Sequence, residues 1–184
     1  MPRVTHVKSA RKANPRYGIE IGDSYYHWAF MVGGRGGPKI CSKTPPTRSQ
    51  LTHSDFLGQA YALADDAFPA CQDAEALRAL AEDVRALGEE QTEKYDNMPE
   101  GLQQGDSGQL LEERASECEE WASAIEEAAD TLESAIAEIE GKGRDDFDEL
   151  DEDSTEDEIE AARQAEIDEA LQTALDDAGS ACPF

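Results

Sequence analysis

The chain has 184 residues, of which 39% are hydrophobic, 32% are charged and only 7% are aromatic, a balance that argues against one large globular core. No apolar run approaches the roughly 18 residues that span a bilayer, and the N-terminal residues contain no apolar signal-peptide core. We therefore expect an intracellular protein without a membrane segment. The four cysteines form no C-x-x-C pair, so reduced, partly buried thiols are expected in place of a zinc knuckle or a disulfide scaffold: Cys41, Cys71, Cys118 and Cys182.

The net charge of −26 is divided unevenly along the chain. Residues 1–50 contain nine lysines and arginines against two acids, whereas residues 51–184 contain seven against forty. This division predicts a basic head followed by an acidic body.

The basic head begins with residues 1–17, which hold no acid and read as a basic arm because two prolines discourage a long helix. Residues 24–32 are rich in aromatic and branched side chains and predict a strand. A glycine-rich turn follows at 33–38, and residues 39–43 return as a second strand. The resulting β-hairpin needs a cover for its aromatic face, either a third strand at 17–21 or the next helix.

The acidic body is predicted to be helical. Thr52 or Ser54 can cap a first helix, whose Leu57 and Tyr61 would roof the hairpin. Asp73 can cap a second helix over 73–97, which a loop at 98–108 connects to a third helix ending at Gly141. The third helix has apolar residues at seven-residue spacing, typical of a coiled-coil seam, and the short loop favours antiparallel pairing with the second: Leu111, Cys118, Ile125, Leu132 and Ile139.

Beyond Gly141, the segment from residue 145 to 160 contains eleven acids in sixteen residues and no base, too few apolar residues to order itself. A fourth helix begins near Thr155, and residues 179–184 are expected to be loose. The expected fold class is α+β and mainly α: a small β-hairpin head, an antiparallel helical hairpin and an acidic C-terminal helix. The expected segments are 1–50 for the arm and head, 51–140 for the helical hairpin, 141–158 for an acidic linker, and 159–184 for the last helix and tail.

Cations and aromatic rings in the basic head make it a candidate nucleic-acid surface, since cations neutralise phosphates and rings stack on bases. Tyr25 and His27 would be exposed on the second face of the hairpin. The alternative is that the cations pair with the acidic body and the rings form the hairpin core. The candidate contacts are Arg3, Lys8, Arg11, Lys12, Arg16, Tyr25, His27, Arg35 and Lys39.

The acidic run offers a second candidate surface, because as a helix it would span about 24 Å and approach the charge spacing of duplex DNA. An ordinary solvated acidic face is the simpler alternative. Residues 149–160 also fit a calcium-loop template imperfectly, and weak unspecific cation binding explains that match better. The candidate acidic surface comprises Asp145, Asp146, Asp148, Glu149, Asp151, Glu152 and Asp153.

Nothing in the sequence marks a catalytic constellation. His53, Ser54 and Asp55 are adjacent, but a helix start capped by serine explains them better than a catalytic triad, which folding assembles from distant residues. The glycine turn lacks the Gly-Lys-Ser/Thr ending of a phosphate loop. We therefore expect no enzyme activity, no metal, no cofactor and no small-molecule substrate.

Several motifs resemble a group of uncharacterised bacteriophage proteins over about residues 1–140. They are Lys-Ser-Ala-Arg-Lys at 8–12, Gly-Asp-Ser-Tyr-Tyr-His-Trp at 22–28, Ser-Lys-Thr-Pro-Pro at 42–46, Asn-Met-Pro-Glu-Gly-Leu at 97–102 and Gly-Gln-Leu-Leu-Glu-Glu-Arg at 108–114. The resemblance implies a phage origin, an accessory role and a place in the host cytoplasm. The strand with Trp28 and Phe30, the Gly-Gly turn and the returning strand are more distantly similar to the arm-binding β domains of phage integrases, which implies DNA binding.

These observations favour a non-enzymatic phage accessory protein whose basic head binds nucleic acid or a nucleic-acid-processing machine. The second hypothesis is a DNA mimic, whose acidic body inhibits a host DNA-binding or defence protein. The third is a structural coiled coil that forms a homodimer through the heptad face.

Overall fold

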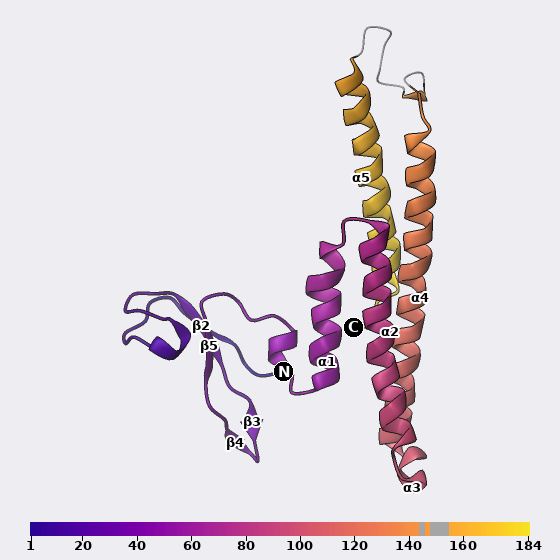
Figure 1. The fold of residues 1–184 in the computed structure, drawn as a ribbon. Helices are drawn as coiled ribbons and strands as arrows, with labels where there is room; N and C mark the ends of the chain where they lie inside the picture. The colour runs from indigo at the N-terminus through magenta and orange to yellow at the C-terminus, as the bar shows by residue number, and fades with distance from the viewer. Residues whose placement is uncertain (144–145, 148–154) are drawn as a thin grey trace. The chain divides into compact units, whose positions relative to one another are not determined.

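The computed structural model describes residues 1–143, 146–147 and 155–184, and these fold as two compact units. The N-terminal unit comprises Met1–Ala62 and the C-terminal unit comprises Leu63–Phe184. Figure 1 shows a small sheet in the first and long helices in the second. The predicted fold class, α+β and mainly α, is confirmed. The first helix belongs to the N-terminal unit, although the sequence analysis grouped it with the helical hairpin.

The sheet of the N-terminal unit has three antiparallel strands in the order β1 (Thr5–Val7), β2 (Tyr25–Trp28) and β5 (Ile40–Ser42). The β2–β5 hairpin is confirmed, with Trp28 opposite Ile40. The predicted third strand at 17–21 is wrong, because the chain leaves a 3-10 turn, Pro15–Tyr17, through Gly18 at φ 63° and then makes only an isolated bridge between Ile19 and Asn14. The third strand comes instead from the predicted basic arm, where β-branched Thr5 and Val7 suit an extended edge.

The hairpin extends beyond the sheet as a two-stranded ribbon of β3 (Met31–Val32) and β4 (Arg35–Gly36). Gly33 and Gly34 connect these strands with φ values of 56° and 77°, the left-handed pair that a tight hairpin turn requires. The pairing register shifts by one residue between the sheet and the ribbon, so Ala29 opposes both Pro38 and Lys39. This is a β-bulge, which redirects the side chain of Lys39.

The loop between β1 and β2 is held by backbone hydrogen bonds and is not a free arm. Ala10 is buried, donates its N–H to Asp23 and accepts a hydrogen bond from Gly22. The Asp23 carboxylate lies 2.8 Å from Lys43 Nζ, at the end of β5. The N–H of Glu20 and the side chain of Lys43 both donate to this carboxylate and lower the pKa of Asp23. The basic loop is therefore fixed to the sheet.

The first unit ends with a 3-10 turn, η2 (Ser49–Leu51), and helix α1 (Asp55–Ala62). Ser54 caps α1 by accepting the Leu57 N–H at 3.3 Å, as predicted. The second unit opens with a π-turn, η3 (Leu63–Ala67), and a 3-10 turn, η4 (Phe68–Ala70). The predicted break at Pro69 lies within η4.

The C-terminal unit is built on the antiparallel pair α2 (Ala74–Asp96) and α4 (Asp106–Glu140), with the short α3 (Glu100–Gln103) between them. Asp73 caps α2 through a 2.7 Å hydrogen bond from the Ala76 N–H, as predicted. The heptad seam is buried within this hairpin, since Cys118 and Ile125 are 0% exposed and Leu132 is 1% exposed. The predicted helical hairpin is confirmed.

Two small residues allow the helices of this unit to approach closely. A Cβ at Gly88 on α2 would lie 2.9 Å from the Cβ of Cys118 on α4. A Cβ at Gly179 would lie 3.2 Å from the ring of Phe68. Phe68 and Phe184 both make edge contacts with the fully buried Trp121. The expectation of a loose C-terminal tail is therefore wrong.

Helix α5 (Glu156–Ser180) packs along α4. Thr155 begins α5 with a capping box that includes Glu158, so the predicted helix start is confirmed. Lys142 Nζ lies 2.6 Å from Glu166 of α5, and its ammonium is 5.7 Å from the centre of the buried Phe147 ring. Six of the seven predicted acidic-surface residues lie outside the described residues: Asp145, Asp148, Glu149, Asp151, Glu152 and Asp153.

Candidate nucleic-acid interface

The N-terminal unit contains a hollow with a volume of about 730 Å³. Strand β2, the first residues of the chain, the ribbon and helix α1 all contribute to its wall. None of the fourteen described residues that line it is acidic. Its wall contains aromatic and apolar side chains, two histidines and two cations, namely Trp28, Phe30, Met31, Leu57, Tyr61, His27, His53, Arg3 and Lys39.

The aromatic part of the wall is held in place by contacts among its own neighbours. The Phe30 and His53 rings lie 3.8 Å apart between centroids and are tilted by 45°. The guanidinium of Arg48 sits 4.5 Å over the Tyr61 ring and is not itself a lining residue. Arg48 therefore supports Tyr61 from outside the hollow by a cation–π contact. Phe30, His53 and Tyr61 all line the hollow.

The two cations of the hollow, Arg3 and Lys39, are exposed and form no ion pair within the N-terminal unit. That unit has only three acids, and one of them, Asp23, is already paired with Lys43. Burial, together with the positive charge of Lys39, lowers the pKa of His27. His27 is therefore neutral at neutral pH, and the positive charge available to an anion comes from Arg3 and Lys39.

Three of the nine sequence-predicted contact residues, Arg3, His27 and Lys39, come together at this hollow. Tyr25 and His27 were expected to be exposed, but both are half-buried, with ring centres 6.2 Å apart. Arg35 is exposed on β4, beside the ribbon turn. The four remaining cations are exposed in or beside the β1–β2 loop and do not line the hollow: Lys8, Arg11, Lys12 and Arg16.

Phe30, His53 and Tyr61 were not expected to belong to one site. Phe30 was expected in the predicted strand, His53 at a helix start, and Tyr61 in the helix that would roof the hairpin. The signal was present in the alternation of β2 and in the helical spacing of Leu57 and Tyr61. The alternation could not show that the chain leaves the regular strand after Trp28 and brings Phe30 against His53.

Trp28 contributes to the same wall and is only 3% exposed. Its indole Nε1 is buried and donates to no acceptor among the described residues. A buried donor without a partner costs roughly 1–3 kcal/mol of stability. Because the Nε1 atom itself is buried, this unsatisfied donor lies in the packed interior of the unit, although other atoms of Trp28 line the hollow.

The C-terminal unit presents a different surface, in which the cations are used internally. Arg85 donates two hydrogen bonds to Glu126 across the α2–α4 pair, at 2.9 and 2.8 Å. Arg78, about two helical turns earlier on α2, bonds Asp130 and Glu133 of α4. The side-chain hydrogen bond from Arg85 lowers the pKa of Glu126. These pairs align the helices and leave a large surplus of acids facing solvent.

Of the predicted acidic surface, the structure describes only Asp146. It is exposed, and its carboxylate accepts the Gly143 N–H at 2.7 Å. Among the residues that the structure describes, no group of three or more histidine, cysteine or acidic side chains could hold a metal ion. Thr155, which the calcium template would use as a ligand, serves as the cap of α5.

The cysteines and the serine beside His53 have structural roles. Burial raises the pKa of the Cys118 thiol to about 11 and also raises the pKa of Cys71. Both thiols are therefore protonated at neutral pH and poor nucleophiles. The four cysteines are thiols and not disulfide partners, and Ser54 is the N-cap of α1.

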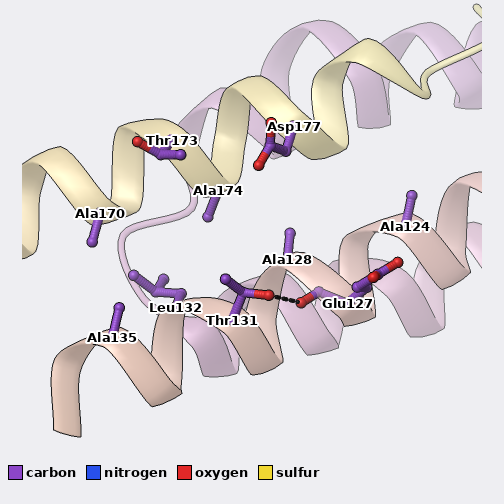
Figure 2. Close-up of a pocket in the computed structure, with 10 residues that line it drawn as sticks. All are labelled: Ala124, Glu127, Ala128, Thr131, Leu132, Ala135, Ala170, Thr173, Ala174 and Asp177. Carbon is purple, nitrogen blue, oxygen red and sulfur yellow. Dashed lines mark hydrogen bonds between the residues drawn. The ribbon is translucent and has the colours of Figure 1, made fainter. Parts of the chain in front are cut away.

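A second concavity, of about 430 Å³, lies between α4 and α5. Figure 2 shows Ala128 and Ala135 of α4 and Ala170 and Ala174 of α5 pointing into it. Thr131 Oγ1 is bonded to the Glu127 carbonyl at 2.9 Å and so donates within its own helix. The groove follows from the small side chains at this helix contact, and its polar lining residues are Glu127, Thr131, Thr173 and Asp177.

Comparisons with protein families, with curated proteins and with solved structures found no match for this chain. No helix among the described residues is both long and apolar enough to cross a membrane. The assignment of a function therefore depends on the geometry of the two units.

Proposed function

We propose that this chain is a non-enzymatic accessory protein that binds nucleic acid, or a nucleic-acid-processing machine, through its N-terminal unit. The hollow carries this proposal: aromatic rings and two cations without carboxylate partners share one concavity, and no described lining residue is acidic. Cations neutralise phosphates, and aromatic rings stack on bases of any sequence. If the resemblance to phage proteins holds, the proposed activity belongs to the cytoplasm of a host cell.

The cations outside the hollow extend the proposed surface. Lys8, Arg11 and Lys12 follow β1 directly in a loop that backbone hydrogen bonds fix to the sheet. A fixed loop places its charges with a smaller loss of conformational entropy on binding than a disordered arm would. The hollow supplies stacking, and the loop supplies further phosphate contacts.

The test compares two lysines by charge reversal. Lys39→Glu changes the hollow, whereas Lys94→Glu makes the same charge change at an exposed lysine of α2. Binding of labelled DNA and RNA oligonucleotides is measured by fluorescence anisotropy at low and at moderate salt. We expect Lys39→Glu to weaken binding by about tenfold or more, and Lys94→Glu to leave it nearly unchanged. Equal effects of the two variants would mean that only net charge matters.

The C-terminal unit favours a second candidate, the DNA mimic, through one observation. Twelve acids and one base lie on α4, an ordered helix of 35 residues and so about 52 Å long. Mimicry needs charges at fixed positions, and helices that pack together provide them. Binding to a DNA-binding protein would then depend on solvent-facing acids such as Glu120 and Glu127.

The mimic candidate has its own experiment. Host proteins retained by the full chain are recovered after nuclease treatment, and duplex DNA is then added as a competitor. The mimic predicts one DNA-binding protein that DNA displaces. Glu120→Gln with Glu127→Gln would weaken its retention, whereas Lys39→Glu would not. If Lys39→Glu abolished retention of the host protein, the contact would instead belong to the N-terminal unit.

A further inference from the structure

The hollow in the N-terminal unit is concave, and this shape restricts the nucleic acid that can use it. In a duplex, each base is stacked and paired, so its faces are covered and only its edges reach the grooves. The aromatic rings that line the hollow therefore cannot stack on the face of a base within a duplex. A base must leave the duplex, or belong to a single strand, before it can enter such a hollow.

We infer that the hollow takes the base of one unpaired nucleotide in a single strand, with the adjoining phosphates held by Arg3 and Lys39. This inference rests on the proposed function and adds the class of nucleic acid. The volume of about 730 Å³ is within the range of sites for small molecules and accommodates one base with its sugar. Phe30, His53 and Tyr61 supply the rings against which the base lies.

The positions of the cations favour single-stranded nucleic acid, and not a free nucleotide, as the ligand of the hollow. Arg3 precedes β1 and Lys8 follows it, so four residues lie between them and an extended chain separates their Cα atoms by roughly 16 Å. One nucleotide in the hollow has its phosphate at Arg3 or Lys39 and does not reach the cations beyond β1. A strand that leaves the hollow passes along them and neutralises Lys8, Arg11 and Lys12 as well.

The experiment uses the full chain and three ligands of matched sequence: a single strand, the corresponding duplex and the mononucleotide as competitor. We expect the single strand to bind at least tenfold more tightly than the duplex, and the mononucleotide to compete only weakly. A fluorescent adenine analogue within the strand reports on stacking, and its emission should fall on binding. These three measurements need no variant.

Ring-removing variants then locate the base. Tyr61→Ala and Phe30→Ala should each weaken single-strand binding by about tenfold. Tyr61→Phe retains the ring and should bind as the parent chain does, which separates stacking from the loss of a hydroxyl. Circular dichroism checks that each variant is folded. If a variant unfolds, the emission measurement on the parent chain tests stacking in its place.

The outcomes separate this inference from the function on which it rests. Absence of binding to any nucleic acid at low salt would overturn the inference and direct nucleic-acid binding, and would leave a nucleic-acid-processing machine as the partner of the proposed function. Equal binding of duplex and single strand, with no effect of Tyr61→Ala, would overturn the single-strand inference and leave nucleic-acid binding intact. A mononucleotide that competes as well as the strand would show that the hollow holds a free nucleotide, and would also overturn the inference.

Discussion

The two units of this chain use their charged residues in opposite ways. The N-terminal unit has nine lysines and arginines against three acids, and the cations of its hollow have no carboxylate partner within the unit. In the C-terminal unit, Arg78, Arg85, Lys94, Lys142 and Arg163 all form ion pairs with its acids. The cations named in the second unit pair with its acids, whereas Arg3 and Lys39 of the first unit line a hollow that has no acidic residue among its described lining.

The two units also differ in whether the residues that pack the core are the same as those that form the candidate surface. In the C-terminal unit, core residues and surface residues are different side chains, because the apolar seam is buried at the contacts of α4 while the acids face solvent. In the N-terminal unit the same residues serve both purposes, since Trp28, Phe30 and Tyr61 belong to the hydrophobic side of a very small domain and also line the hollow. Substitutions should therefore separate stability from surface chemistry in the second unit more cleanly than in the first.

The largest expected effect is on the seam of the C-terminal unit. Leu132→Asp buries a charge at a position that is 1% exposed, and we expect it to lower the free energy of unfolding by about 3–5 kcal/mol. Leu110→Asp is the matched control on the same helix, where the leucine is 43% exposed and the change should be within about 0.5 kcal/mol. Urea unfolding followed by circular dichroism measures both.

The same pair of variants tests the homodimer hypothesis. The seam residues are buried within a single chain, so a homodimer through the same face would require the α2–α4 hairpin to open. We expect Leu132→Asp to unfold a monomer. A variant that keeps its helical signal but changes from dimer to monomer in sedimentation would show that a second copy covers the seam.

The second effect concerns the charge of the N-terminal unit. Lys8→Glu combined with Arg11→Glu and Lys12→Glu reverses three exposed cations, and nucleic-acid affinity at low salt should fall by about a hundredfold. Thermal stability should change little, because none of the three is ion-paired within the unit. Anisotropy titrations measure the affinity. Unchanged affinity for both DNA and RNA would remove the β1–β2 loop from the interface.

These two predictions differ in how much of their basis was available from the sequence. The seven-residue spacing of Cys118, Ile125 and Leu132 identified the seam and its antiparallel partner, because helical periodicity is a local property of the chain. The caps at Ser54, Asp73 and Thr155 were readable for the same reason. The sequence did not identify Trp121 as the centre of an aromatic cluster, since its partners Phe68 and Phe184 lie far away along the chain.

The candidate site was harder to predict, because it depends on short strands and on a register shift. Thr5–Val7 pairs with β2 across a long loop, and nothing local in those three residues distinguishes an edge strand from an arm. The bulge at Pro38 and Lys39 follows from pairing that a one-dimensional pattern cannot show. Composition identified the cations and the rings, but only the folded chain shows which of them share a hollow.

A smaller effect is expected where the α2 and α4 backbones approach. Gly88→Ala places a Cβ 2.9 Å from that of Cys118. Such overpacking lowers the free energy of unfolding by roughly 1–3 kcal/mol. The better helix propensity of alanine offsets about 1 kcal/mol of this loss. We expect a net loss of about 1 kcal/mol in urea unfolding. Gly101→Ala in α3 is the control, since its Cβ would meet nothing within 4 Å. An equal change in both would remove the close approach as the cause.

The smallest effect is a pH dependence of opposite sign in the two units. Burial lowers the pKa of His27, so its contribution to stability is present above the ordinary pKa of 6.5 and is lost as the pH falls through the lowered value. Burial, with the nearby Glu113, raises the pKa of Glu117, so its contribution is present below 4.5 and is lost as the pH rises through the raised value. Acidification from pH 7 to about 5.5 should therefore weaken the N-terminal unit and slightly stabilise the other.

Each unit has one tryptophan, which allows the two effects to be followed separately. Trp28 reports on the N-terminal unit in a Trp121→Phe chain, and Trp121 reports on the C-terminal unit in a Trp28→Phe chain. The urea midpoint seen by Trp28 should fall on acidification, and His27→Asn should remove that fall. Acidification should have the opposite effect on phosphate binding at His27. A phosphate beside His27 favours its protonated imidazole, so the phosphate binds more tightly as the pH decreases. An affinity that is independent of pH would place the phosphate away from His27.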